Sequence, residues 1–320
     1  MFNTVLYAIN FGDFYYENLD CFAHYSKIGL KEIVLIHVID PSIFQHSLYS
    51  AYKKEDEEKI RKFAEIKLED IKKYLEKSGF GVRYVIRVGN IAEEIAEEAK
   101  AENIDFVVLD KKAGGKPKRY FSFYGSPIYD ILIKVEKPVF IMRRVLFHSS
   151  SDFKNDRKTN CRNLFDDVVF AADFSESSLK ALPLIMKIPD DVIKLFTILH
   201  IIDEKFIKGL KDSNNNEIEN YEKSLAEKFE PVIRGLNYMF TKEKSNLAIV
   251  VRKGVPYKEI VDFIEETGKK LLVLGFKGRD KEGLREIVFG STAERIKCIA
   301  VLDIDSKVGK RRIRKETVLS

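Results

Sequence analysis

The sequence predicts an α/β protein of two similar domains, each a five-stranded parallel sheet with helices on both faces. Three observations predict it. Short apolar segments typical of strands alternate with amphipathic segments typical of helices, which is the order of βαβ units. The strand segments are apolar almost throughout, as expected when both faces of a sheet are covered. The same order of elements then occurs a second time after a polar segment.

The first half of the chain contains the first set of elements. Each expected strand is an apolar run that ends near Gly, Pro, Asn or Asp, and each expected helix has apolar residues at a spacing near 3.6. The clearest helix is 54–77, which Ser78 and Gly79 terminate. The strands are expected at 4–10, 32–40, 84–88, 106–109 and 138–142, and the helices at 17–28, 54–77, 91–101 and 126–135.

The second half repeats this order after a segment rich in Ser, Asn and Lys, which indicates a linker. We therefore divide the chain into domains 1–147 and 164–306, a linker 148–163 and a basic tail 307–320. The second set of strands is expected at 167–173, 194–202, 247–252, 271–274 and 298–302, and the helices at 177–186, 217–234 and 257–266.

Matching segments stand at a nearly constant offset. Asp40 and Asp203 end the similar runs His-Val-Ile-Asp and His-Ile-Ile-Asp, 163 residues apart. Gly89 and Gly254 are 165 residues apart, as are the pairs Gly125-Ser126 and Gly290-Ser291. An offset held across five strands indicates two copies of one domain.

Composition and charge narrow the function classes. With 45% hydrophobic and 33% charged residues and no apolar run long enough to span a bilayer, we expect a soluble protein without a membrane partner. The net charge of +5 equals the excess of basic residues in the tail 307–320, so no domain carries a basic footprint for nucleic acid. The tail, which is expected to be a solvated end, is the only segment that could contact RNA or a membrane surface.

The three cysteines are scattered at Cys21, Cys161 and Cys298. They have neither the spacing of a metal site nor the even number of a disulfide framework. We expect separate buried or incidental thiols, no metal site, and a cytoplasmic protein in a reducing compartment.

Glycines mark the end of the expected strand 271–274. Gly275 and Gly278 follow this strand, and Gly290-Ser291-Thr292 opens an expected helix, so the pattern is G-x2-G-x11-G-S-T. The free N–H groups and the dipole of a helix N-terminus favour an anion, and glycine allows the backbone to approach it. This is not a P-loop, because Leu284-Arg285 stands where Lys-Ser/Thr is required. The simpler alternative is three loop glycines and a capping serine.

This pattern resembles the phosphate-binding signature of the universal stress protein family, G-x2-G-x9-G followed by Ser or Thr, with a loop two residues longer. The segments Asp173-Phe-Ser-Glu-Ser-Ser and His200-Ile-Ile-Asp look like the family's first turn and second strand end, and the resemblance covers nearly the whole chain. It implies an adenine nucleotide α-hydrolase-like, Rossmann-like fold that binds ATP, AMP or ADP, with Mg²⁺.

The resemblance implies roles for ten residues of the second domain. Asp173 would accept hydrogen bonds from the ribose or adenine, although it could equally be a turn former. Ala171 and Ile201 would form walls around the base, although plain core is compatible with them, and Leu274 and Gly275 would let the nucleotide lie close to the backbone. The phosphates would be held by Lys277, Gly278, Gly290, Ser291 and Thr292. The alternative for Lys277 is a solvated surface charge.

The first domain departs from the pattern. Asn10 stands in place of Asp173, Asp110 in place of Gly275, and Ala113 in place of Gly278, although Gly125-Ser126 is retained. Asp110 adds a negative charge and a Cβ where a phosphate would approach. We expect a degenerate copy, although basic residues in its loop leave another anion pose open.

The leading hypothesis is a tandem universal stress protein that binds ATP in its second domain and acts in nucleotide sensing or stress response. The alternatives are a nucleotide-independent interaction module and an enzyme that slowly hydrolyses ATP or transfers AMP. No H-E-x-x-H or G-x-S-x-G motif supports catalysis, and His37 and His200 are expected to be core histidines. The two domains are expected to pair as an internal pseudo-dimer through 138–142 and 298–302, and a further homodimer is left open.

Overall fold

The computed structural model describes residues 1–41, 54–112, 127–144, 161, 163–203, 246–275 and 300–302, except positions 13, 15, 175 and 190. It also describes a few helical positions between 223 and 234. The chain divides into two compact units, Met1–Arg162 and Asn163–Ser320.

The first unit contains a five-stranded parallel sheet in the order β3-β2-β1-β4-β5, as the sequence predicts. The first strand is central, so the chain builds outward on one side of β1 and then on the other. The boundary between β1 and β4 is therefore the topological switch point, where α/β sheets bind ligands beyond the strand ends. The strands are β1 (Thr4–Ala8), β2 (Glu32–Ile39), β3 (Gly81–Val88), β4 (Phe106–Lys112) and β5 (Val139–Arg144).

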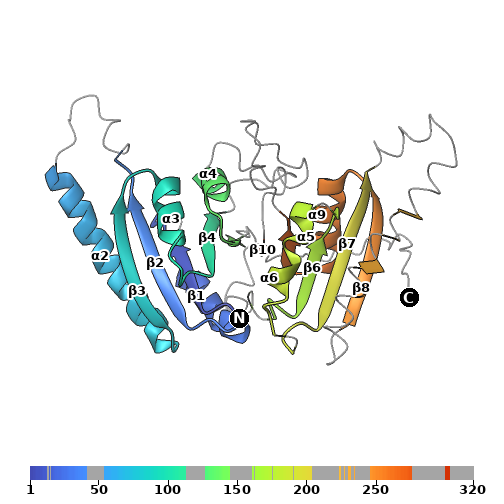
Figure 1. Cartoon of the computed structure of the whole chain (residues 1–320). Coiled ribbons are helices and arrows are strands. Elements are labelled where there is room, and N and C mark those ends of the chain that lie inside the picture. Colours follow the sequence, from blue (N-terminus) through green and yellow to red (C-terminus); the bar gives the residue numbers. More distant parts are fainter. Residues whose placement is uncertain are drawn as a thin grey trace, which may run out of the picture. The chain divides into compact units, whose positions relative to one another are not determined.

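Helices flank this sheet, and Figure 1 shows α2 (Lys54–Lys77) running along β3 and β2, with α3 (Ile91–Ala99) beside α4 (Pro127–Lys134). The expected helix 17–28 is instead a run of short turns, η1 (Tyr16–Cys21), α1 (Phe22–Tyr25) and η2 (Ser26–Ile28). Asn and Asp have weak helix propensity because their side chains can compete for backbone hydrogen bonds, so Asn18 and Asp20 disfavour a regular helix here.

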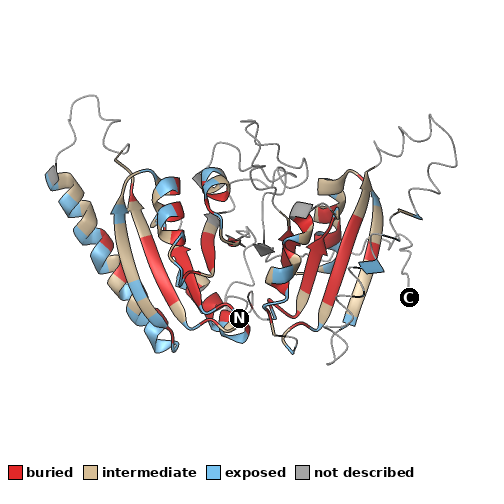
Figure 2. Ribbon diagram, viewed as in Figure 1, coloured by how far each residue is buried: buried red, intermediate tan, exposed pale blue. Residues whose placement is uncertain are grey.

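Aromatic side chains fill the core between these turns and the sheet. The ring of Tyr25 lies 6.1 Å from that of Phe106 and 6.0 Å from that of Phe140, while Phe22 lies 5.0 Å from Tyr7. All five side chains are buried. Figure 2 shows the buried residues concentrated in the central strands, while the outer side of α2 is exposed. Aromatic burial of this extent stabilises the turns despite their weak helix propensity.

The second unit contains four parallel strands in the order β9-β6-β7-β8. The described part of the expected last strand is β10 (Ala300–Leu302), which pairs antiparallel with β9 rather than parallel to it. An antiparallel neighbour does not need the crossover connection that a parallel one requires. The four parallel strands are β6 (Asp167–Ala171), β7 (Leu195–Asp203), β8 (Asn246–Gly254) and β9 (Leu271–Leu274).

The helices of the second unit differ from expectation at one place. The expected helix 177–186 is split into α5 (Glu176–Leu179) and α6 (Leu182–Ile185). Pro183 is responsible, because proline has no N–H and its ring clashes with the preceding helical turn. The helix α9 (Pro256–Thr267) ends at Gly268, which has a left-handed φ of 65°. The expected helix 217–234 lies mostly outside the described residues.

A glycine stands at the same place in both repeats: Gly89 directly follows β3, and Gly254 is the last residue of β8. Gly89 and Gly254 have φ values of +159° and +155°, and each is approached by a glutamate from the following helix. A Cβ on Gly89 would lie 2.5 Å from Glu94 Oε1, and one on Gly254 would lie 2.6 Å from Glu259 Oε1. The repeat therefore preserves a close contact at the start of both helices.

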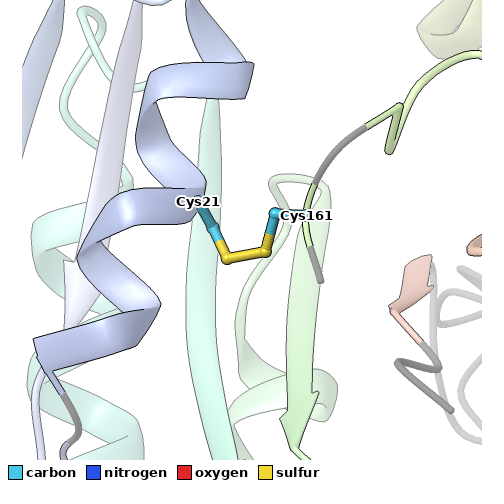
Figure 3. Close-up of a disulfide and its surroundings, with 2 residues drawn as sticks. All are labelled: Cys21 and Cys161. Carbon is cyan, nitrogen blue, oxygen red and sulfur yellow. A yellow bond between two sulfur atoms is a disulfide. The ribbon is translucent and has the colours of Figure 1, made fainter. Parts of the chain in front are cut away.

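The expectation of three separate thiols is wrong for two of them. Cys21 and Cys161 form a disulfide across a sequence separation of 140 residues, with their Cα atoms 5.3 Å apart (Figure 3). Their spacing gives no signal of the pairing, because connectivity is set by the fold and not by sequence distance. Cys298 lies outside the described residues.

Candidate functional site

Five of the ten residues selected from the sequence lie in the described part of the second unit, and they gather at one edge of its sheet. Ala171 pairs in register with Leu199 of β7 on one side and with Leu274 of β9 on the other. Ile201 lies two residues beyond Leu199, and Gly275 directly follows Leu274. Because parallel strands end on the same side, these residues and Asp173 lie near the carboxyl ends of three adjacent strands.

The apolar residues at these strand ends belong to the hydrophobic core of the second unit. Ala171 and Leu274 are buried in a cluster with Phe263 and Ile264 of α9, and Ile201 packs against it while remaining partly exposed. Asp173 is exposed. Apolar core residues therefore lie at these strand ends and a carboxylate is exposed beside them, a combination that suits a ligand with an apolar ring and hydroxyl groups.

A histidine fixes the chain immediately before Asp173. His200 Nδ1 lies 2.7 Å from the carbonyl oxygen of Ala172. Because a carbonyl only accepts, Nδ1 carries the proton and donates it. His200 is buried, so its interpretation as a hydrogen-bonded core histidine is confirmed.

The sequence interpretation overlooked two aromatic residues near this edge. Phe174, directly after Asp173, has a left-handed φ of 60°, and its ring lies 5.2 Å from that of His200. Such a φ is uncommon for a bulky residue, so its surroundings must hold it there. Tyr257 packs partly buried against the same core cluster as Ile201. Neither position carries a sequence signal, since an aromatic residue beside a turn or in a helix usually belongs to the core.

The other five selected residues are Lys277, Gly278, Gly290, Ser291 and Thr292, and they lie outside the described residues. Within the described part of the chain, no group of three or more His, Cys, Asp or Glu side chains could hold a metal ion. A Mg²⁺ ion that accompanies a nucleotide is typically bound through phosphate oxygens and water, so it does not require such a group.

The first unit has the same histidine-to-carbonyl hydrogen bond but no aspartate in the position of Asp173. His37 Nδ1 lies 2.9 Å from the carbonyl oxygen of Ile9, at the same separation of 28 residues as in the second unit. Burial lowers the pKa of His37, and the hydrogen bond to Ile9 opposes that shift. Asn10, in the position of Asp173, turns back so that its Oδ1 accepts from Gly12 N at 3.1 Å. The turn after β1 is thus held by the same kind of histidine hydrogen bond, but it carries the amide of Asn10, which is hydrogen-bonded within the turn.

A hydrogen-bonded pair distinguishes the first unit at its switch point. The phenol of Tyr7 on β1 donates a hydrogen bond to Asp110 at the end of β4. The second unit has Phe170 and Gly275 in these positions. Burial, followed by the charge of Asp110, raises the pKa of Tyr7 and of Tyr25 above the ordinary tyrosine value. The carboxylate that sequence reasoning placed in the phosphate's path thus has a specific partner within the unit.

Comparison with known proteins agrees with the fold. The model of the universal stress protein family matches residues 1–143 and again 164–297. Universal stress protein MJ0577 of Methanocaldococcus jannaschii is 28% identical over 158 residues, covering 45% of this chain and 96% of the relative. MJ0531 of the same organism is 27% identical over 160 residues, covering 50% of this chain and 89% of the relative. A solved universal stress protein from Archaeoglobus fulgidus covers 93% of this chain and 95% of its own, with 18% identity and a TM-score of 0.65.

The chain therefore belongs to the universal stress protein family and carries two such domains in tandem. Among the helices that the structure describes, none is both long and apolar enough to cross a membrane.

Proposed function

We propose that this tandem universal stress protein binds ATP in its second domain and acts as a nucleotide-sensing or stress-response protein. The observation that carries the proposal is the apolar edge formed by Ala171, Ile201 and Leu274 at the carboxyl ends of adjacent strands. That is where sheets of this topology accept nucleotides.

Each described residue fits one part of the ligand. The partly exposed Ile201 would offer an apolar surface to the adenine, and the buried Ala171 and Leu274 form the core against which Ile201 packs. Asp173, exposed beyond β6, would accept hydrogen bonds from ribose hydroxyls. Gly275 has no Cβ and would let the chain of phosphates pass close to the backbone.

The phosphates would be bound by the remaining residues of the glycine pattern. Gly278, Gly290, Ser291 and Thr292 would donate backbone N–H and hydroxyl groups, Lys277 would add a positive charge, and Mg²⁺ would bind phosphate oxygens. AMP or ADP would use the same apolar edge with fewer phosphate contacts.

The experiment compares two matched glycines. Replacing Gly290 with Leu should abolish ATP binding in isothermal titration calorimetry, because the side chain fills the space of a phosphate. Replacing Gly125, its counterpart 165 residues earlier, should leave ATP binding unchanged. Circular dichroism controls for folding in both variants, and unchanged affinity in a folded Gly290→Leu variant would refute the phosphate assignment.

Mass spectrometry of the nucleotide released by denaturing the purified protein then identifies the ligand. A protein that neither carries nor binds an adenine nucleotide would instead be an interaction module. ATP turnover that exceeds that of the Gly290→Leu variant would make it an enzyme.

A further inference from the structure

The disulfide connects the beginning of the first unit to its end. Cys21 is the last residue of η1, and Cys161 lies one residue before the boundary between the units (Figure 3). Both residues are buried, with 6% and 7% of their surface exposed. Their Cα separation of 5.3 Å lies within the range usual for disulfides.

The bond shortens the covalent path from one unit to the other. Residues 145–166 separate the end of β5 from the start of β6, whereas only residues 162–166 separate Cys161 from β6. At roughly 3.4 Å per extended residue, the maximum span falls from roughly 75 Å to roughly 17 Å.

The short path that remains is itself anchored in the second unit. Leu164 and Phe165 are buried, and Asp166 N donates to Asn163 O at 3.2 Å. Asp166 also forms an ion pair with Lys194 at 2.6 Å. The disulfide therefore attaches η1 to Cys161, and only residues 162 and 163 separate Cys161 from the buried Leu164 of the second unit.

We propose that Cys21 and Cys161 form a redox-controlled tether that sets the length of chain between the two domains. When the disulfide is present, only residues 162–166 lie between the covalently held Cys161 and the start of β6. When it is reduced, the longer segment of residues 145–166 alone joins the domains, so the chain permits a wider range of separations. The proposal is independent of nucleotide binding.

The reaction is thiol–disulfide exchange with a low-molecular-weight disulfide such as oxidised glutathione. One cysteine thiolate attacks a sulfur of that disulfide and releases one glutathione thiolate. The second cysteine thiolate then attacks the mixed disulfide, forms the Cys21–Cys161 bond and releases the second glutathione. Both thiol protons pass to solvent or to the released thiolates, and the two electrons lost by the cysteines reduce the glutathione disulfide.

The first test measures the chemistry in the full-length protein. The chain is equilibrated at a series of ratios of oxidised to reduced glutathione, its remaining thiols are alkylated, and its peptides are identified by mass spectrometry. We expect a disulfide-linked peptide pair containing Cys21 and Cys161 to replace the alkylated forms as the ratio rises. Thiols that stay alkylated at every ratio, or a pairing with Cys298, would overturn the proposal.

The second test measures its consequence by small-angle X-ray scattering. We expect the reduced protein to have a larger radius of gyration and a broader distance distribution than the oxidised protein. Cys161→Ser should behave like the reduced protein under both conditions, whereas the control Cys298→Ser should keep the redox response. Identical scattering from the oxidised and reduced wild-type protein would overturn the proposal without depending on any variant.

Discussion

At the scale of single residues, two replacements made together distinguish the two copies of the site. In the first domain Tyr7 and Asp110 are joined by a hydrogen bond, while their counterparts Phe170 and Gly275 have no polar side chain. A buried phenol and a carboxylate are each costly without a partner, and each satisfies the other. The first copy therefore has a polar contact at its switch point where the second copy has a glycine and a phenylalanine.

Burial of Tyr7 and Tyr25, together with the nearby charge of Asp110, makes the stability of the first domain sensitive to alkaline pH. Tyrosine in an unfolded chain ionises near pH 10, and in the folded domain the pKa values of Tyr7 and Tyr25 are higher. The resulting stabilisation is complete below about pH 10 and is lost as the pH rises toward the folded pKa values. Each pH unit above 10 should cost about 1.4 kcal/mol for each of the two tyrosines that remains protonated in the folded state.

Alkaline titration followed by phenolate absorbance and circular dichroism measures this loss. Tyr7→Phe should make the loss of stability less steep above pH 10, and Tyr16→Phe, which alters an exposed tyrosine, serves as the control. A first domain whose unfolding free energy stays constant above pH 10 would contradict the prediction.

At the scale of elements, the two copies begin their equivalent helices α3 and α9 differently. Asn90 caps α3, and its Oδ1 accepts from Ala92 N at 3.1 Å and from Glu93 N at 3.2 Å. Its counterpart Val255 makes no side-chain cap bond to α9, although its extended backbone suits a capping residue. The start of α9 relies instead on Pro256, whose fixed φ favours the first turn.

We predict opposite effects from exchanging these caps. Asn90→Ala should destabilise the first domain by about 1 kcal/mol, and Val255→Asn should stabilise the second by roughly 0.5–1 kcal/mol. Denaturant unfolding that resolves both transitions measures the two changes. If both substitutions destabilise their domains equally, side-chain capping does not distinguish these helices.

The elements also explain which expectations hold. The helix 54–77 has the bounds expected from its apolar periodicity and from Gly79, because both signals are local. The segments 17–28 and 177–186 differ because Asn18, Asp20 and Pro183 interrupt the helix. The disulfide depends on contacts across 140 residues, which no local pattern reports.

The candidate site is likewise predictable where the signal is local, and not where it depends on contacts between residues distant in the sequence. The family resemblance selected Ala171, Ile201 and Leu274, and they lie close together because parallel strands align their carboxyl ends. The left-handed backbone of Phe174 and the position of Tyr257 depend on packing against His200 and the core, so sequence alone does not indicate them.

At the scale of the whole molecule, we predict one nucleotide per chain. The first domain holds the Tyr7–Asp110 pair where the second has Phe170 and Gly275, so a carboxylate stands in the first domain where the second has a residue without a Cβ. Calorimetric titration with ATP should reach saturation at one equivalent. Two equivalent sites per chain would show that the first domain also accepts the ligand.

The pairing of the two domains through their last strands stays a prediction. Apolar strand edges tend to associate, and two similar domains related by a two-fold axis would pair them antiparallel. In a chain carrying Cys298→Ser, cysteines at Ile141 and Val301 should form a crosslink, whereas cysteines at Val82 and Ala248 should not. The reverse outcome would place the contact between other faces.

The central position of β1 has a consequence for the synthesis of the protein. One neighbour, β2, follows closely in the chain, but the other, β4, begins at Phe106, almost 100 residues after β1 ends at Ala8. At about 5–20 residues per second on the ribosome, the buried edge of β1 waits roughly 5–20 s for its partner. During that time the nascent chain exposes a strand edge flanked by core side chains, so we expect chaperones that bind such edges to engage it before residue 112 has emerged.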